Sequence, residues 1–87
     1  MISIIINILN EADVIDKTLT SLFNQTYKYI EIIVVNDGST DNLDNIIKPW
    51  LEKITYIKFD KNKGRQVARN TGIAASKGEY LFVCDAD

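Results

Sequence analysis

The sequence predicts a single α/β domain with a mostly parallel sheet of four strands, flanked by helices. Two observations lead to this prediction. Four short, almost continuously apolar segments alternate along the chain with three amphipathic ones, the pattern of a parallel sheet covered on both faces. With 87 residues, the chain is long enough for one small domain and too short for a second.

The four apolar segments are the expected strands, at residues 3–9, 30–35, 54–59 and 80–84. Successive parallel strands need crossover connections, and these are almost always right-handed. In a mononucleotide-binding half-sheet, the chain winds outward through the first three strands and then returns to place the fourth beside the first. We therefore expect a Rossmann-like half with strand order 3-2-1-4, and ligands beyond the carboxyl ends of its strands.

The three amphipathic segments are the expected helices, because their apolar residues recur at helical spacing. These residues are Ile15, Leu19, Leu22 and Phe23 in the first segment, and Leu43, Ile46, Ile47, Trp50 and Leu51 in the second. Pro49 should bend or shorten the second helix. The third helix, at about residues 65–76, has a face of small residues that should let it lie close to the sheet: Ala68, Thr71, Gly72 and Ala75.

The composition is that of a soluble globular protein, with 46% hydrophobic and 25% charged residues. A net charge of −2 makes nucleic acid an unexpected partner. One cysteine cannot form an internal disulfide, and with no histidine we expect neither a zinc site nor a histidine base. Any metal would be a hard cation held by carboxylates. Motifs of P-loop and dinucleotide-binding enzymes are also lacking from the sequence.

Polar residues follow each expected strand, so they should gather at one edge of the sheet. We expect Asp41 to cap the second helix. We expect Glu11 and Asp13 to stabilise the N-terminal turn of the first helix through its dipole. Asp85 and Asp87 follow the fourth strand and are two residues apart. Two carboxylates this close repel each other, and a divalent cation such as Mg²⁺ or Mn²⁺ would stabilise the pair.

Several segments, taken together and in this order, resemble the N-terminal, nucleotide-sugar-binding half of the family-two glycosyltransferases with the A-type fold. The match runs over the whole chain, at residues 3–6, 10–11, 22–27, 31–41, 62–64, 68–72, 77–80 and 85–87. It includes the run Asn36-Asp37-Gly38-Ser39-Thr40-Asp41 and the final Asp85-Ala86-Asp87. The resemblance implies that residues 1–87 are the N-terminal part of a longer glycosyltransferase domain, cut just after the Asp-x-Asp motif.

The resemblance also implies roles for individual residues. Asn7 and Leu9 stand where the family has a proline and an aromatic ring that line the nucleobase pocket, and Glu11 is a further candidate on this loop. Asp37 matches the acid that reads the base, typically the imide of uracil. The remaining candidates are Arg65 or Arg69 for the base or diphosphate, Asp85 for the ribose or the metal, and Asp87 for the metal. For Arg69, a structural role that ties the third helix to the sheet edge is an equal alternative.

The implied reaction is sugar transfer from a nucleoside diphosphate sugar to a carbohydrate or lipid-linked acceptor. We expect a UDP-linked donor, and the choice between UDP, GDP and dTDP stays open. The divalent metal would bridge the diphosphate. The catalytic base is expected beyond Asp87, so we expect these 87 residues to bind donor without turnover. The alternative is a non-catalytic module that binds a nucleotide or a protein. Retention or inversion stays open, although the family favours inversion.

Two further expectations concern the surroundings of the chain. A cytoplasmic location is expected, at the inner face of the membrane if other parts of the protein attach it there. The fourth strand should form a bare edge of the sheet, and bare edges pair with other chains. We therefore expect self-association through this strand. We also expect Cys84, on the same strand, to be a small buried residue beside the site.

Overall fold

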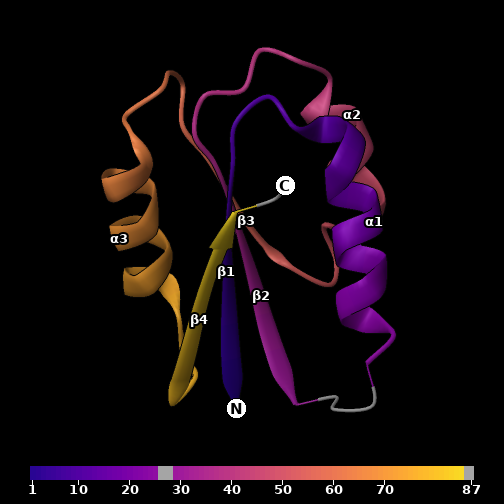
Figure 1. The fold of residues 1–87 in the computed structure, drawn as a ribbon, viewed down its shortest axis with the longest axis vertical. Coiled ribbons are helices and arrows are strands. Elements are labelled where there is room, and N and C mark those ends of the chain that lie inside the picture. The colour runs from indigo at the N-terminus through magenta and orange to yellow at the C-terminus, as the bar shows by residue number, and fades with distance from the viewer. Residues whose placement is uncertain (26–28, 86–87) are drawn as a thin grey trace.

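The chain folds into a parallel four-stranded sheet with helices on both faces, as a computed structural model shows for residues 1–25 and 29–85, the last of these by its backbone alone (Figure 1). The strands are β1 (Ile2–Ile8), β2 (Ile30–Asn36), β3 (Thr55–Lys58) and β4 (Tyr80–Asp85). The helices are α1 (Ala12–Phe23), α2 (Leu43–Ile47), the 3₁₀ turn η1 (Lys48–Trp50) and α3 (Arg65–Ala75).

The strand order is β3-β2-β1-β4 with every pair parallel, so the predicted fold class and order are confirmed. The central strand β1 fixes the register of both neighbours. Its residue Ile8 lies opposite Asn36 of β2, and Asn7 lies opposite Asp85 of β4. The carboxyl ends of β1, β2 and β4 therefore meet at one edge, and the loops that follow them lie together.

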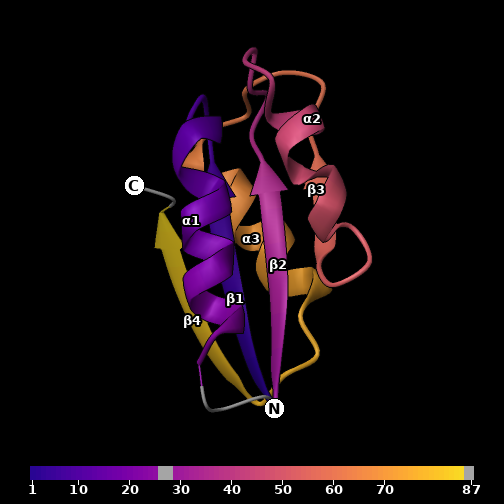
Figure 2. The ribbon, with the colours of Figure 1, turned by 90° about the vertical axis from the view of Figure 1, so that its right-hand side faces the viewer.

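One face of the sheet packs against α1 and α2, which lie in front of the strands in Figure 2. Alternate residues of β1 supply its core, because successive side chains of a strand point to opposite faces. This core cluster contains Ile4, Ile6, Ile8, Ala12, Ile15, Leu19, Ile32, Val34, Leu43 and Ile47. The α-helical hydrogen bonding of α2 ends at Ile47 and η1 contains Pro49, so the predicted shortening at the proline is confirmed.

The other face packs against α3, as both ribbon views show (Figures 1 and 2). Ala68 and Gly72 are buried on the side of α3 that faces the sheet. A Cβ atom on Gly72 would lie 2.4 Å from Cγ2 of Ile5, so only a residue without a side chain lets the helix approach this closely. The predicted small-residue face is therefore the packing surface of α3.

A chain of polar contacts fastens the short edge strand β3 to the rest of the fold. The Asn36 amide donates to the Tyr56 hydroxyl at 2.8 Å, and that hydroxyl donates to Oδ1 of Asp44 at 3.0 Å. Lys58 forms an ion pair with the same carboxylate, and its hydrogen bond is the main reason that the Asp44 pKa lies below its usual value. Burial raises the pKa of Tyr56 to about 12. These contacts join β2, β3 and α2.

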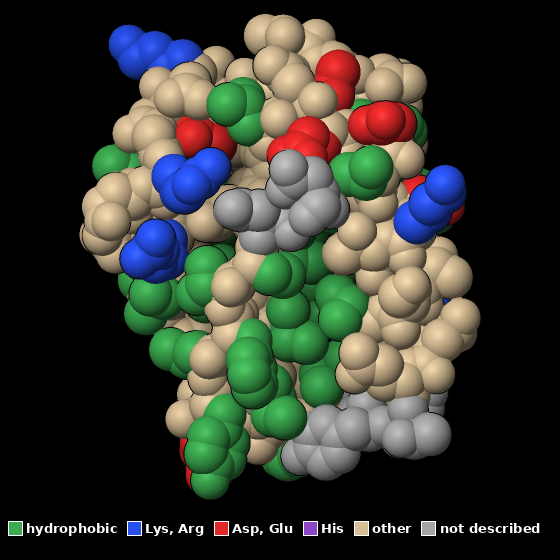
Figure 3. Space-filling view, viewed as in Figure 1, with side chains coloured by type: hydrophobic (Ala, Val, Ile, Leu, Met, Phe, Trp, Pro, Cys, Tyr) green, Lys and Arg blue, Asp and Glu red, His purple; other side chains and the backbone are tan. Residues whose placement is uncertain are grey.

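The opposite edge strand, β4, carries an exposed apolar surface. Tyr80, Leu81, Phe82 and Val83 are all exposed, with Phe82 at 60%. Figure 3 shows the hydrophobic patch over this edge, below the charged groups at the carboxyl end of the sheet. Within the residues described, the structure has no helix long and apolar enough to cross a membrane.

Candidate functional site

Hydrogen bonds join the loop after β1 to the loop after β2. The backbone N–H of Asn10 donates to Oγ of Ser39 at 2.9 Å, and the N–H of Thr40 donates to Oδ1 of Asn10 at 2.8 Å. Asn10 has a φ of 54°, a left-handed conformation that asparagine tolerates better than most residues. Sequence reasoning missed this positioning role, for which the only signal was an asparagine directly after a strand.

Asp41 connects the starts of two helices rather than one. Its Oδ1 accepts from the N–H of Leu43 at 3.2 Å, and its Oδ2 accepts from the N–H of Ala12 at 3.0 Å. Asn42, not Asp41, immediately precedes α2, so the predicted cap acts from one residue further back. Asp13 lies in the first turn of α1, as predicted, and Glu11 immediately precedes that helix. The carboxylate of Asp41 thus fixes where α1 and α2 begin.

Asp37 joins the loop after β2 to the loop after β3. Its side chain is buried, with 5% exposure, and its Oδ1 accepts from the backbone N–H of Lys63 at 2.7 Å. Its own N–H donates to the carbonyl of Ile8 at 2.9 Å, which continues the pairing of β2 with β1. In the described part of the chain, Oδ2 of Asp37 accepts no hydrogen bond, so this oxygen is available to a ligand.

Two adjoining cavities open at this edge of the sheet. We call the first the Asp37 cavity, and it has a volume of about 180 Å³. It is lined by Asn7, Ile8, Leu9, Glu11, Asp37 and Arg65. The structure therefore brings five of the residues selected from the sequence around one space, and it adds Ile8, which sequence reasoning did not select.

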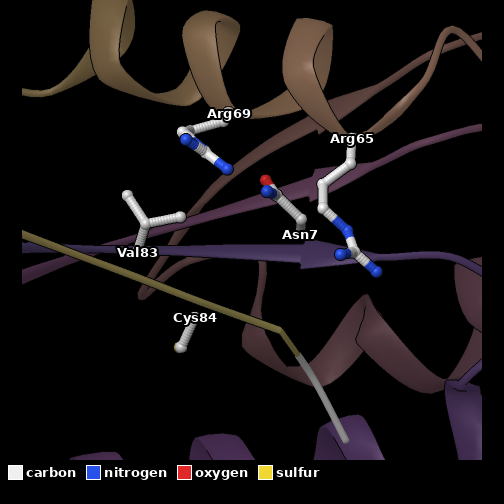
Figure 4. A pocket seen from close by; sticks show the side chains of 5 residues that line it. All are labelled: Asn7, Arg65, Arg69, Val83 and Cys84. Atoms are coloured by element: carbon white, nitrogen blue, oxygen red, sulfur yellow. The ribbon is translucent and has the colours of Figure 1, made fainter.

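The second, which we call the Arg69 cavity, lies between α3 and the strands β1 and β4 and has a volume of about 370 Å³. It is lined by Asn7, Arg65, Arg69, Val83 and Cys84. Figure 4 shows the Arg69 side chain pointing from α3 toward Asn7, which rises from β1, while the Arg65 side chain extends from α3 past Asn7 toward the end of β1. Among the residues described, neither guanidinium forms an ion pair. Two unpaired cations and an amide favour a ligand rich in anionic or carbonyl oxygens.

Cys84 is exposed, so the prediction of a buried residue is wrong. The cause is its place on an edge strand, where only one neighbouring strand covers the backbone. In Figure 4 its side chain points away from Asn7, while that of Val83 points toward the side of the arginines. Alternation along β4 explains this difference. Val83 and Cys84 are lining residues that sequence reasoning did not select.

Asn7 and Arg65 line both cavities, and Asn7 is the uncharged one of the two. It is buried, with 7% exposure, and in the part of the chain that the structure describes neither Nδ2 nor Oδ1 has a hydrogen-bond partner. A buried amide without partners costs about 1–3 kcal/mol of stability. The site therefore holds a buried polar group that no described residue satisfies.

The two carboxylates of the expected metal site lie at or beyond the end of β4. The backbone of Asp85 ends this strand, opposite Asn7, while Asp87 and the side chain of Asp85 lie outside the described residues. Within the described residues, the structure gathers no group of three or more potential metal ligands. The chemical fit rests on the donor set, because two carboxylates are oxygen ligands of the kind that Mg²⁺ and Mn²⁺ prefer.

Comparison with known proteins agrees with this architecture. The model of glycosyl transferase family 2 matches residues 3–87. Glycosyltransferase GlyA of Streptococcus pneumoniae is 43% identical over 89 residues, a match that covers 99% of this chain and 13% of GlyA. The chain thus spans only a small part of this relative.

Solved structures give the same result for the fold. The mannosyltransferase PcManGT of Pyrobaculum calidifontis, in complex with GDP-Man and Mn²⁺, superimposes with a TM-score of 0.91 at 28% identity, over 99% of this chain and 27% of that one. TarS 1–349 of S. aureus, in complex with UDP-GlcNAc, gives 0.87 at 27% identity, over 99% and 26%. With its parallel β3-β2-β1-β4 sheet and a family match over almost its whole length, the chain belongs to glycosyl transferase family 2.

Proposed function

We propose that the chain is the nucleotide-sugar-binding part of a glycosyltransferase, and that its donor is a nucleoside diphosphate sugar with a UDP group. One observation carries the proposal: the buried carboxylate of Asp37 faces a cavity at the carboxyl ends of β1 and β2 that it shares with Asn7, Leu9, Glu11 and Arg65. Ligands of open parallel sheets bind in this position. The complexes of PcManGT with GDP-Man and of TarS with UDP-GlcNAc support the donor class.

In this proposal each residue has a role set by its chemistry. Asp37, a pure acceptor, binds a ring N–H of the base through its available oxygen. Leu9 and Glu11 line the same cavity and shape the nucleoside site. Arg65 and Arg69 supply donors and positive charge for the diphosphate, because guanidinium groups match phosphate oxygens. Asp85 would contact the ribose or share the metal.

The proposed metal is Mg²⁺ or Mn²⁺, held by Asp87 with Asp85. When bound, such an ion stabilises the negative charge that grows on a diphosphate leaving group. The Mn²⁺ in the PcManGT complex supports a divalent cation in this family. The chain's own contribution is to hold the nucleotide at Asp37 and to place the arginines beside it.

We propose that the remaining steps of the reaction use parts of a longer protein. The chain spans about 13% to 27% of the length of the relatives described above. Residues 1–87 are therefore proposed as the N-terminal part of a glycosyltransferase domain, and the Asp-x-Asp motif is the last segment of this part. An acceptor hydroxyl of a carbohydrate or lipid-linked molecule, and the base that deprotonates it, would be bound elsewhere. These residues alone are expected to bind donor without transfer. A cytoplasmic location, at the inner membrane face if the protein is attached there, rests on the family resemblance alone.

A titration of the ¹⁵N-labelled chain with UDP, with and without Mg²⁺, tests this function. We expect chemical-shift changes at Asp37, Arg65, Asp85 and Asp87 that require the metal, because the metal and the nucleotide bind together. Asp87→Ala should remove the metal dependence. The matched control is Asp60→Ala, which deletes an exposed acid outside both cavities and should leave the titration unchanged.

The outcomes separate the function from its alternative. A folded chain that binds no UDP, GDP or dTDP under either condition would contradict the donor proposal and favour a non-catalytic protein-binding module. Binding of GDP or dTDP in place of UDP would support the proposed donor site but show that its nucleobase is not uracil. Equal metal dependence in the Asp87→Ala chain would remove Asp87 from the metal site.

We also propose that the isolated chain self-associates through β4. This edge strand exposes four consecutive apolar residues, 80–83, and its free backbone groups can pair with a second copy. Sedimentation velocity should show an oligomer that grows with protein concentration, and Phe82→Lys should shift it to monomer, because a charge on the edge opposes pairing. A monomer at high concentration in the unchanged chain would contradict this proposal.

A further inference from the structure

We propose that Ser3, Glu31 and Gly78 are positioning residues for the Asp-x-Asp motif. They lie at the amino end of the sheet, where they fix the register of β4 against β1, and this register places Asp85 opposite Asn7 at the carboxyl end. None of the three lines either cavity. The inference goes beyond the proposed function by naming what sets the position of the motif, and its consequence for metal binding rests on that function.

The first argument is that β4 does not specify its own register. Residues 80–84 are apolar at every position, and β4 pairs only with β1 in the described sheet. Its side chains are exposed on both faces of the sheet, with Phe82 on one face at 60% and Val83 on the other at 41%. A strand specifies its register through an alternating pattern with one buried face, and β4 has neither. A slip of one residue would bring Cys84 opposite Asn7 and would turn every side chain of β4 to the other face.

The second argument is the way in which the loop before β4 is held. This loop, residues 76–79, joins α3 to β4, and β1, β2 and β4 all begin at the same end of the sheet (Figure 1). Three consecutive backbone N–H groups, those of residues 77–79, donate hydrogen bonds to the two other strands or their ends. Their acceptors, in order, are Oε1 of Glu31 at 2.8 Å, Oγ of Ser3 at 2.8 Å and the carbonyl of Met1 at 3.0 Å. We call these three hydrogen bonds the amino-end clasp. Three successive donors with three fixed acceptors hold the loop at one position along β1.

Ser3 and Glu31 also hold each other in place. Ser3 is fully buried, and its hydroxyl donates to Oε1 of Glu31, its register partner on β2, at 2.7 Å. Because the hydroxyl proton is used toward Glu31, the oxygen is left as an acceptor for the N–H of Gly78. A Cβ atom on Gly78 would lie 2.5 Å from this oxygen and 2.8 Å from the backbone nitrogen of Ser3. Only glycine therefore lets the loop lie this close to β1.

The third argument is that a strand transmits the position of its start to its end. The seven positions from Gly78 to Asp85 span about 23 Å of extended backbone, which cannot stretch further. The packing of α3 against the sheet does not set this position by itself, because a loop of four residues can absorb a shift of about 3.3 Å, one residue of a strand. The amino-end clasp removes this freedom. It therefore acts on Asp85 from the opposite end of the sheet, through the backbone of β4.

NMR spectroscopy of the ¹³C,¹⁵N-labelled chain tests the inference, because NOEs between backbone protons of β1 and β4 report the register directly and need no ligand. The first variant is Gly78→Ala, which gives the native register a backbone clash that a slipped strand avoids. We expect about a tenth of the molecules to keep the native register, and Mn²⁺ in the presence of UDP to bind about tenfold more weakly, because apparent affinity falls with the fraction of competent molecules. Paramagnetic broadening measures the Mn²⁺ affinity.

Ser3→Ala is the second variant, and it decides the question if Gly78→Ala does not fold. It removes the hydroxyl without adding volume, so a second set of β4 signals should appear beside the native set. Glu31→Gln is the conservative variant, because its amide oxygen can still accept from Ser3 and from the N–H of Lys77. The Glu31→Gln chain should keep the native register and the original Mn²⁺ affinity.

The matched control is Tyr56→Phe, which also removes a hydroxyl that accepts one hydrogen bond and donates one, but at the opposite edge of the sheet. It should lower the Tm and leave β4 in register. Native NOEs at full strength in folded Ser3→Ala and Gly78→Ala chains would overturn the inference, and so would a slipped register with unchanged Mn²⁺ affinity. An original chain that shows the native register but binds neither Mn²⁺ nor UDP would contradict the proposed function, while the NOEs of the variants still decide what sets the register.

Discussion

Gly38→Ala is expected to destabilise the chain by about 2–5 kcal/mol, since it adds a steric clash to a backbone conformation that alanine avoids. Gly38 has a φ of 77°, and a Cβ atom on it would lie 2.4 Å from the backbone nitrogen of Asn62 and the carbonyl carbon of Lys61. Backbone atoms cannot rotate away as a flexible side chain can. The loops after β2 and β3 would have to separate. This would strain the hydrogen bond from the N–H of Lys63 to Asp37, which joins the two loops.

Gly64→Ala is the matched control for this prediction. Gly64 also has a positive φ, 98°, but no atom lies within 4 Å of the position its Cβ would take. Alanine there should lower the free energy of unfolding only through the unfavourable positive φ, by about 1–3 kcal/mol. Urea unfolding can follow both variants through Trp50, the single tryptophan, which stacks on Phe23 with ring centroids 5.5 Å apart. Equal unfolding midpoints for the two variants would show that the contact between the loops adds nothing.

Asp37→Asn is expected to weaken UDP binding by about 10- to 150-fold, because hydrogen bonds to a charged group contribute about 1.5–3 kcal/mol. The amide keeps the shape of the side chain, and its oxygen can still accept from the N–H of Lys63. The amide nitrogen of asparagine takes the position of the second carboxylate oxygen. It is a hydrogen-bond donor, so it would face the ring N–H of uracil, which is also a donor. The folded structure should therefore persist while the affinity falls.

The measurement is the dissociation constant for UDP in the presence of Mg²⁺, together with the unfolding midpoint. Asp60→Asn is the control, because it removes the same charge from an exposed residue that lines neither cavity. Its affinity should equal that of the original chain. If Asp37→Asn and Asp60→Asn bind UDP equally well, Asp37 does not read the base, although the chain could still bind the nucleotide through its arginines.

The architecture could be predicted because it depends on patterns local to each element. In runs such as residues 30–35, every position except Glu31 is apolar, which identifies a strand buried on both faces. The small face of residues 68–75 identifies a helix that lies against a sheet. Right-handed crossovers and the return of the fourth strand then leave one strand order, and the structure has it.

The site could be predicted in part, for a related reason. Polar residues at the ends of parallel strands meet at one edge, so Asn7, Leu9, Glu11, Asp37 and Arg65 were expected together and do line one cavity. Their roles in binding stay predictions. Cys84 was predicted buried and is exposed, because the burial of β4 depends on what lies beyond the edge of the sheet, which the pattern of that strand does not contain.

The sequence by itself determined the elements, their order in the sheet and the family. The tertiary structure alone decided which polar atoms have partners. Asp37 meets Lys63 across 26 positions of the chain, and Asn10 meets Thr40 across 30, through contacts that exist only once the loops are folded together. That the buried amide of Asn7 has no partner among the described residues could likewise be seen only in the folded structure. Hydrogen bonds depend on distances of a few tenths of an ångström between segments far apart in sequence, whereas strands and helices depend on the spacing of neighbouring residues.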